Sequence, residues 1–241
     1  MAFCDGRSGL LRIRANWRWL RERAGDFLFG RPGKALSGPL GSSVATPSRS
    51  SHAAPAGIVS PFSYRDPAVR QGILELKSHG SAQIGAFFAR ALHPELLRSI
   101  NESRRDEDGI ESTAAVPILL IPIPSSRRRR KQRGFNQTEI VARELARIDA
   151  DAGPAGAHAL SLCLGLLIKA RHTPPQTSLS SRAARLSNLS GCFAVTDPAR
   201  VRDAVAILLD DVTTTGATLH EAKKTLLEAG ARRVIPVAIA H

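Results

Sequence analysis

Cysteine is scarce in this sequence, and its few residues are scattered. Only Cys4, Cys163 and Cys192 occur. Their spacing does not match a zinc ribbon, and an odd number does not fit a paired disulfide framework. We therefore predict no zinc site and expect a reducing, cytosolic setting.

Long apolar runs are also missing. No window approaches the roughly 18 consecutive apolar residues that span a bilayer, so we expect a soluble, cytoplasmic protein without a transmembrane segment. The strings G-x-x-x-x-G-K-[ST] and G-x-G-x-x-G, which are typical of nucleotide-binding loops, do not occur. Aromatic residues make up only 5% of the chain, which counts against a dedicated single-strand DNA-binding module built on base stacking.

Acidic residues are the minority among the charged residues. Asp and Glu number 21 against 34 Lys and Arg, which gives a formal net charge of +13. Such a balance favours a polyanionic partner, for example a polyphosphate, a nucleic acid or a membrane surface. Charge alone does not choose among these partners.

The chain, with 241 residues, is long enough for one ordinary domain and an appendage. Residues 1–36 are predicted to hold a basic amphipathic helix, because arginines accompany apolar residues at spacings of three and four. This helix either attaches to an anionic membrane or a partner groove, or it docks on the chain's own domain. Residues 37–61 are rich in Ser, Pro and Gly and are predicted to be a linker, so the folded domain spans residues 62–241.

Hydrophobic periodicity predicts alternating helices and strands in the folded domain. Two helices are expected on either side of a break at Gly80, and another over residues 217–229 that ends at Gly230. The other expected elements are a helix at 134–148 and strands at 116–123, 192–195, 204–209 and 234–239, with a further apolar stretch at 160–168. Strands that alternate with helices imply an α/β fold with a parallel sheet.

A hydroxyl-rich turn follows the strand expected at residues 204–209 and opens directly into the next helix. Unpaired N–H groups and the positive dipole end of a helix attract an anion, and threonine hydroxyls add donors, so the turn suits a phosphate monoester. Glycine within it allows close approach of the backbone. The candidate binding residues are Asp210, Asp211, Thr213, Thr214, Thr215, Gly216, Ala217 and Thr218.

Asp210 and Asp211 stand beside this phosphate site, where they would repel a bare anion. They need another role, such as accepting hydrogen bonds from ribose hydroxyls. Their place at the carboxyl end of a strand is where open α/β sheets bind ligands. The alternative is an N-cap cluster, in which Asp and Thr only satisfy helix donors. That alternative accounts for one Asp and one Thr but not for the whole string.

The string Asp210-Asp211-Val212-Thr213-Thr214-Thr215-Gly216, after its apolar strand, resembles the phosphoribosyl pyrophosphate (PRPP) motif of type I phosphoribosyltransferases (PRTases). Further stretches resemble the ComF-type, competence-associated branch of that family, and the match covers about residues 62–241. These stretches are Tyr64 to Gly80 as an entry helix, Ile121-Pro122-Ile123-Pro124 with residues 130–137, and residues 171–177 with Arg182, Arg185 and Asn188.

The resemblance implies a type I PRTase fold, with a mostly parallel twisted sheet flanked by helices, a small hood and an irregular N-terminal extension. Asp210 and Asp211 would bind the ribose hydroxyls, and residues 213–218 the 5′-phosphate. Mg²⁺, carried mainly by PRPP, would bridge the diphosphate and the ribose. Residues 171–188 would form the hood, from which Arg171 could reach pyrophosphate. Many ComF-type proteins carry an N-terminal four-cysteine zinc module, but here only Cys4 lies in that region.

Residues 127–133 hold six basic side chains in seven positions, directly after the strand expected at 116–123. We expect a loop at the rim of the sheet that stabilises a leaving diphosphate, since the guanidinium fork pairs with phosphate oxygens. The run is too long for one diphosphate, so Arg133 is assigned to pyrophosphate and residues 127–130 are left open. The alternatives are binding of single-stranded DNA through its phosphates, or a solvated charge run.

Three functions are consistent with these features. The first is an enzyme that transfers phosphoribose from PRPP to an unidentified nitrogen acceptor, with Mg²⁺ and release of pyrophosphate. The second is a non-catalytic ComF-type protein of DNA uptake, which binds PRPP or another ribose 5-phosphate together with single-stranded DNA. The third is a scaffold attached through residues 7–31. A second copy of the chain, in a homodimer, is a further candidate partner.

Overall fold

This computed structural model describes residues 55, 57–104, 116–152, 160–170 and 191–241, all within the unit Pro47–His241. The predicted amphipathic segment 1–36 and most of the predicted linker 37–61 lie outside the described residues. So does the predicted hood, with Arg171. The domain limits therefore stay predictions.

A four-stranded parallel sheet forms the centre of the described unit. Its strands, in spatial order, are β2 (Leu160–Leu162), β1 (Ile118–Pro122), β5 (Val205–Val212) and β6 (Arg233–Ala240). All residues of β1 are buried, and so are most of β5 and β6, as is typical of parallel strands covered on both faces. The predicted α/β fold with a mostly parallel sheet is confirmed.

Extended residues lie along the outer edge of β6. Val59 pairs with Val237, and Phe62 pairs with Ala240, both in parallel. Ile58 is buried beside them. The chain around the predicted junction of linker and domain therefore adds to the sheet.

A separate antiparallel pair consists of β3 (Leu167–Lys169) and β4 (Phe193–Val195), and the short helix α7 (Pro198–Val201) follows it. The apolar stretch predicted at residues 160–168 is thus divided into β2 and β3. The division falls at a turn where Gly165 adopts φ 76°, a conformation that glycine adopts without a steric penalty.

Helices α2 (Pro67–His79) and α3 (Ala82–Arg104) lie on either side of Gly80, where the sequence predicted a break. Gly80 adopts φ 63°, the left-handed conformation that commonly ends helices. A Cβ at this position would lie 3.0 Å from the ring of Phe135. The absence of a side chain therefore both ends α2 and makes room for Phe135.

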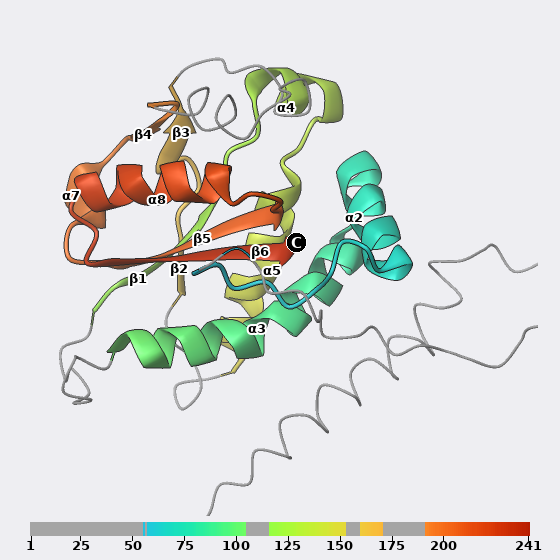
Figure 1. Cartoon of the computed structure of the whole chain (residues 1–241), viewed down its shortest axis with the longest axis horizontal. Coiled ribbons are helices and arrows are strands. Elements are labelled where there is room, and N and C mark those ends of the chain that lie inside the picture. The colour runs from blue at the N-terminus through green and yellow to red at the C-terminus, as the bar shows by residue number, and fades with distance from the viewer. Residues whose placement is uncertain (1–54, 56, 105–115, 153–159, 171–190) are drawn as a thin grey trace, which may run out of the picture. The chain divides into compact units, whose positions relative to one another are not determined.

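Helices cover both faces of the sheet (Figure 1). On one face, α5 (Gln137–Asp151) packs on β1, β2 and β5 and contacts α3, whereas α8 (Ala217–Glu228) packs on β5 and β6 from the other. Apolar side chains fill the interior, among them the fully buried Leu120, Leu145, Ile207 and Leu208. No helix in the described ranges is long and apolar enough to cross a membrane.

Residues 127–133 form a short helix, α4 (Arg127–Arg133), where the sequence analysis expected a loop. Ser126 caps its start, because its Oγ accepts from the N–H of Arg129 at 3.3 Å. Gly134 ends it with φ 79°. Arginine, lysine and glutamine have high helix propensities, so a capped helix forms despite the repulsion among like charges.

Candidate functional site

The carboxyl ends of β1 and β5 lie side by side. The two strands are paired from Ile118 with Val205 onwards, and the N–H of Ile123 donates to the carbonyl of Leu209 at 2.8 Å. The start of α5 therefore meets the end of β5 at one edge of the sheet, where Gln137 reaches Asp211. This edge is where open α/β sheets bind ligands.

Asp211 is buried, and both of its carboxylate oxygens are engaged. Lys77 Nζ of α2 lies 3.1 Å from Oδ2, and Gln137 Nε2 of α5 donates to the same oxygen at 2.7 Å. The other oxygen, Oδ1, accepts from the N–H of Val212 at 2.6 Å. Asp211 thus ties β5 to two helices, and Lys77 compensates its charge.

Asp210, the neighbouring acid, is half-buried at the end of β5. Its Oδ1 accepts from the N–H of Asp211 at 2.8 Å. Burial and the nearby charge of Asp211 raise the pKa of Asp210 to about 7, against the opposing effects of that hydrogen bond and of Lys77 and Lys169. The carboxyl group therefore changes protonation near neutral pH, and only its ionised form is a pure hydrogen-bond acceptor.

The turn after β5 leads straight into α8. Thr213 is buried, whereas Thr214 is exposed. Gly216 is the N-cap residue and provides no capping side chain, and the first turn of α8 holds no acidic residue. Thr215 Oγ1 accepts from the N–H of Ala217 at a long 3.4 Å. The start of α8 thus keeps much of its capacity to bind an anion.

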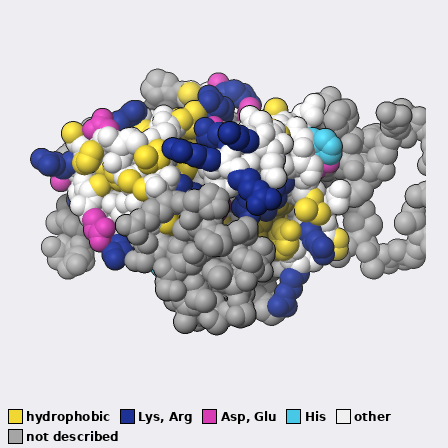
Figure 2. Space-filling model, turned by 90° about the horizontal axis from the view of Figure 1, so that it is seen from above, with side chains coloured by type: hydrophobic (Ala, Val, Ile, Leu, Met, Phe, Trp, Pro, Cys, Tyr) yellow, Lys and Arg dark blue, Asp and Glu magenta, His cyan; other side chains and the backbone are white. Residues whose placement is uncertain are grey.

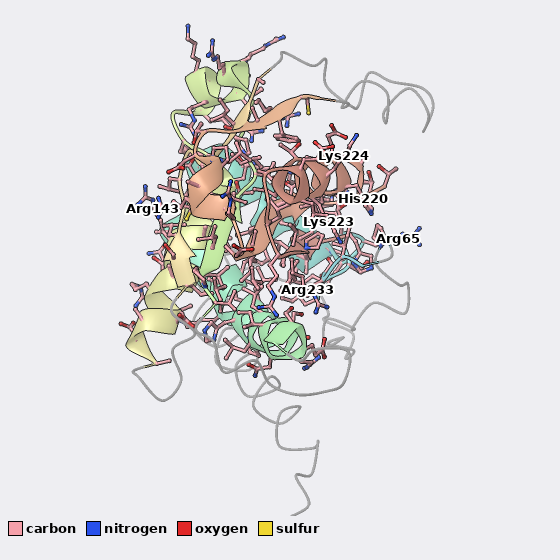
Figure 3. The ribbon with its side chains drawn as sticks, turned by 90° about the vertical axis from the view of Figure 1, so that its left-hand side faces the viewer. Arg65, Arg143, His220, Lys223, Lys224 and Arg233 are labelled. Atoms are coloured by element: carbon pink, nitrogen blue, oxygen red, sulfur yellow. The ribbon has the colours of Figure 1, made fainter. Side chains whose placement is uncertain are left out.

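Gly216 is required by both its conformation and its surroundings. Its φ is 76°, and an added Cβ would lie 2.8 Å from Ile58 Cδ1 and 2.9 Å from His220 Cε1. His220 Nδ1 lies 2.9 Å from the Gly216 carbonyl oxygen, which holds the ring against the turn. Figure 3 shows His220 on α8 with Lys223 and Lys224. Any side chain at position 216 would displace these neighbours.

Asn136 and Thr138 fix the start of α5 against the end of β1. Asn136 Nδ2 and Thr138 Oγ1 both donate to the carbonyl of Ile123, at 3.1 and 2.9 Å, and both residues are buried. Gln137 lies between them in sequence and reaches Asp211. These motif residues therefore support the geometry of the acid pair.

Arg133, predicted to contact pyrophosphate, donates from Nη1 to Gln137 Oε1 at 3.3 Å. It is thus linked to Asp211 through one side chain. Arg130 pairs with Glu139, and no residue of α4 is buried. The view from above, onto the end of the unit where α4 lies, shows Lys and Arg side chains gathered on the surface (Figure 2).

The structure adds two lysines that the sequence analysis did not assign to the site. Lys77 follows the buried Ile73 by one helical turn, and it pairs with Asp211. Lys169 lies on β3, where its charge interacts with that of Asp210. A lysine at a position where the pattern expects an apolar residue is the signal that could have revealed them. Arg171 lies outside the described residues.

Among the described residues, no group of three or more His, Cys, Asp and Glu side chains could hold a metal ion. Asp210 and Asp211 offer the hard oxygen ligands that Mg²⁺ prefers, but Asp211 is already paired with Lys77. A Mg²⁺ ion at this edge would therefore take most of its ligands from water or from a bound phosphorylated compound.

No family model matches the chain. The chain is similar to the DNA utilization protein YhgH of Escherichia coli O157:H7, with 30% identity over 167 residues, which are 67% of this chain and 62% of that protein. It is also similar to the competence protein ComFC of Bacillus subtilis, with 36% identity over 113 residues, 47% of this chain and 40% of that protein. For the competence protein F of Haemophilus influenzae the identity is 31% over 122 residues, 49% of this chain and 48% of that protein.

The chain spans less than two thirds of the length of each of these relatives. The E. coli relative is matched over about two thirds of this chain, and the two competence proteins over about half of it. Similarity to proteins with these names, at a moderate level of identity, supports the ComF-type family for this chain.

Proposed function

We propose that this chain binds PRPP, or another ribose 5-phosphate, at the edge where β1 and β5 end, and that it is a ComF-type protein of DNA utilization with a type I PRTase fold. The observation that carries the proposal is the pair of acids Asp210 and Asp211 at the end of β5. A short turn joins this pair to α8, whose N-cap residue, Gly216, provides no capping side chain. A ribose 5-phosphate suits both features, because it carries hydroxyls for the acids and a phosphate for the start of the helix.

The start of α8 is the proposed 5′-phosphate subsite. The free N–H groups of its first turn lie at the positive end of the helix dipole. Helix starts of this kind commonly bind phosphate. Thr214 is exposed and Thr215 is half-buried, so both hydroxyls are accessible as further donors. Gly216 lets the backbone turn sharply enough to present these groups together.

Asp210 is the proposed acceptor for the ribose hydroxyls. The N–H group of Asp211 donates to the Asp210 carboxylate and holds it in place. For Asp211 to bind the ribose as well, its carboxylate would have to give up its contact with Lys77 or Gln137. Mg²⁺, carried by the diphosphate of the ligand, would neutralise part of its charge. Asp210 is the carboxylate that remains available to contact that ion.

The same edge supports transfer of phosphoribose to a nitrogen acceptor. The lone pair of the nitrogen forms a bond to C1 of the ribose while the C1–O bond to the diphosphate breaks. Pyrophosphate leaves with the electron pair, and the proton of the nitrogen passes to solvent. Such a step needs positioning and stabilisation of the leaving charge more than a protein nucleophile. The arginines of α4 supply positive charge beside the end of β1.

Isothermal titration calorimetry with PRPP and Mg²⁺ tests the proposal. We expect the wild-type chain to bind, and Asp210→Asn to bind at least about tenfold more weakly, because a hydrogen bond to a charged group contributes about 1.5–3 kcal/mol. The double variant with Asp211→Asn should bind more weakly still. Unchanged binding by a folded double variant would overturn the site assignment. Pyrophosphate release from PRPP with a panel of bases tests turnover separately.

A second candidate function is non-catalytic binding of single-stranded DNA beside the phosphoribosyl ligand. The specific observation in its favour is α4, a helix with no buried residue in which arginine predominates. Relatives named for DNA utilization and competence add to it. Contacts of this kind go to phosphates and weaken as salt rises, so salt-dependent binding to an oligonucleotide is the measurable sign.

A further inference from the structure

Four basic side chains lie on one side of the described unit, and none of them belongs to the candidate site or to α4. They are Lys223 and Lys224 of α8, Arg233 at the start of β6, and Arg65 just before α2. Figure 3 shows all four on the same side of the unit, whereas Arg143 lies on the opposite side. These four residues are called the basic row below.

Backbone contacts fix the two ends of the basic row. Arg233 pairs with Val205 where β6 begins. Where β6 ends, the N–H of Tyr64 donates to the carbonyl of His241 at 2.8 Å, and Arg65 follows directly. Since strands rise by about 3.3 Å per residue, the two arginines lie about 26 Å apart along β6. Helix α8 packs on β6 between these ends, so the basic row is extended and not a compact cluster.

Three of the four cations have no close counter-charge. In the part of the chain that the structure describes, no carboxylate forms an ion pair with Arg65, Lys223 or Arg233. The amine of Lys224 lies 3.8 Å from Glu228, and both side chains are well exposed, so this pair is weak. The basic row therefore keeps most of its positive charge available.

The acids next to these cations in sequence bond to backbone groups instead. Asp66 Oδ1 accepts from the N–H of Ala68 at 2.8 Å and caps α2. Glu221 Oε1 accepts from the N–H of Gly191 at 2.6 Å. The structure thus assigns both carboxylates to holding elements in place, and they leave the neighbouring cations unpaired.

An extended row of unpaired cations fits a partner that carries phosphates at intervals along a line, as a single nucleic-acid strand does. An anionic membrane fits less well, because helices that bind membranes insert several large apolar side chains. Leu227 is the one large apolar residue of the fully described α8 that is exposed. Neither α8 nor β6 contains an aromatic residue, so bases have no stacking surface there and the contact would not depend on base sequence.

We propose that the basic row binds the phosphate backbone of single-stranded DNA, independently of its sequence. This surface is separate from the ribose phosphate site, so the inference goes beyond the proposed function and does not depend on it. It also lies on elements other than α4, so variants of the two surfaces can be compared directly.

Fluorescence anisotropy with the full chain and a labelled oligothymidylate of about 16 nucleotides tests the basic row. Each phosphate contact to a single strand adds about 0.7 to the slope of log affinity against log salt. The double variant Lys223→Gln, Arg233→Gln should therefore lower the slope by about 1.4. The same relation predicts a loss of about fivefold in affinity per contact at 0.1 M salt. A second double variant, Arg65→Gln with Lys224→Gln, should behave alike.

Arg143→Gln is the matched control, since Arg143 is an exposed arginine on the opposite side of the unit. Its affinity and salt slope should equal those of the wild type. Urea unfolding of each variant checks that the fold is retained.

Wild-type affinity and slope in both folded double variants would overturn the basic row. So would an equal loss in Arg143→Gln, because the total charge alone would then account for binding. If only the α4 variant Arg128→Gln loses affinity, α4 is the contact and the basic row is not. Vesicles with anionic lipids provide a further arm, and binding to vesicles without binding to the oligonucleotide would refute the proposal. A wild-type chain that binds no oligonucleotide would also refute it, whereas calorimetry with PRPP would still decide the proposed function.

Discussion

The amine of Lys77 lies 3.1 Å from the carboxylate of Asp211 and so joins α2 to β5 across the candidate site. The side chain of Lys77 is 25% exposed and that of Asp211 is 10% exposed, so solvent screens the pair only weakly. Gln137 donates to the same oxygen. The geometry of the acid pair is therefore set by residues on two helices as well as by β5.

Lys77→Met should destabilise the fold by about 2–4 kcal/mol, because it leaves the Asp211 carboxylate buried without its cation. Urea unfolding measures this change. Lys224→Met is the control, since the pair of Lys224 with Glu228 is exposed on both sides and contributes at most about 0.5 kcal/mol. Adding Asp211→Asn to Lys77→Met should restore part of the loss. Equal effects of the two lysine substitutions would contradict the role of the pair.

The pKa of Asp210, raised to about 7, gives stability a defined dependence on pH. In the unfolded chain a carboxyl group of this kind titrates near pH 4, so between about pH 4 and pH 7 the folded state holds an extra proton. Its stabilising contribution is complete below about pH 4 and is lost as the pH rises through 7. We expect the free energy of unfolding of Asp210→Asn to exceed that of the wild type by about 1–2 kcal/mol at pH 8, after allowance for solvent screening. Near pH 4 the two free energies should differ little. Urea unfolding across this range should reveal the trend, and a difference independent of pH would refute it.

Gly216→Ala and Gly134→Ala form a matched pair of substitutions. Both glycines have positive φ, but a Cβ at Gly134 meets nothing within 4 Å, whereas one at Gly216 lies 2.8 Å from Ile58 Cδ1. We expect Gly134→Ala to cost about 1–2 kcal/mol from backbone conformation alone, and Gly216→Ala about 2–4 kcal/mol because crowding is added. Thermal and urea unfolding provide the comparison. If the two variants lose the same stability, the crowding at Gly216 has no energetic effect.

Arg128→Gln on α4 should lower the affinity for a single-stranded oligonucleotide and reduce the slope of log affinity against log salt by about 1. Arg143→Gln is the control, since Arg143 is an exposed arginine on a different helix, α5. Figure 3 shows it on the side of the unit away from His220 and Lys224. Fluorescence anisotropy at several salt concentrations measures both variants. An affinity that does not change with salt concentration, or that falls equally in both variants, would exclude α4 as the surface that contacts the oligonucleotide.

Much of the fold follows from local patterns. The apolar run of β5 was predicted as a buried strand, and the structure confirms a strand there, although it continues through Asp210 and Asp211 to Val212. Gly80 was predicted as a break since glycine adopts left-handed backbone conformations readily, and the structure confirms it with φ 63°. Both predictions depend on neighbours in sequence, which is why they succeed without tertiary information.

The supporting contacts of the site could not be predicted in the same way. Lys77 and Asp211 meet only because α2 and β5 pack together, and no local pattern encodes that distance. The helical state of α4 was missed because a run of like charges suggests a loop, whereas Ser126 and Gly134 cap both ends. The half-buried position of Lys169 depends on the register of β3 with β4. Each case is a tertiary contact or a cap that overrides composition.

The pairing of residues 58–62 with β6 also bears on how the unit folds. Val59 and Val237 are widely separated in sequence, so their contact closes a loop around nearly the whole described unit. Pairings of such long range form slowly, and until this one forms β6 presents an open row of backbone N–H and C=O groups to other chains. The first effect of substitutions at Ile58 or Val59 should therefore be aggregation during refolding, in which strands of other chains pair with the open edge of β6.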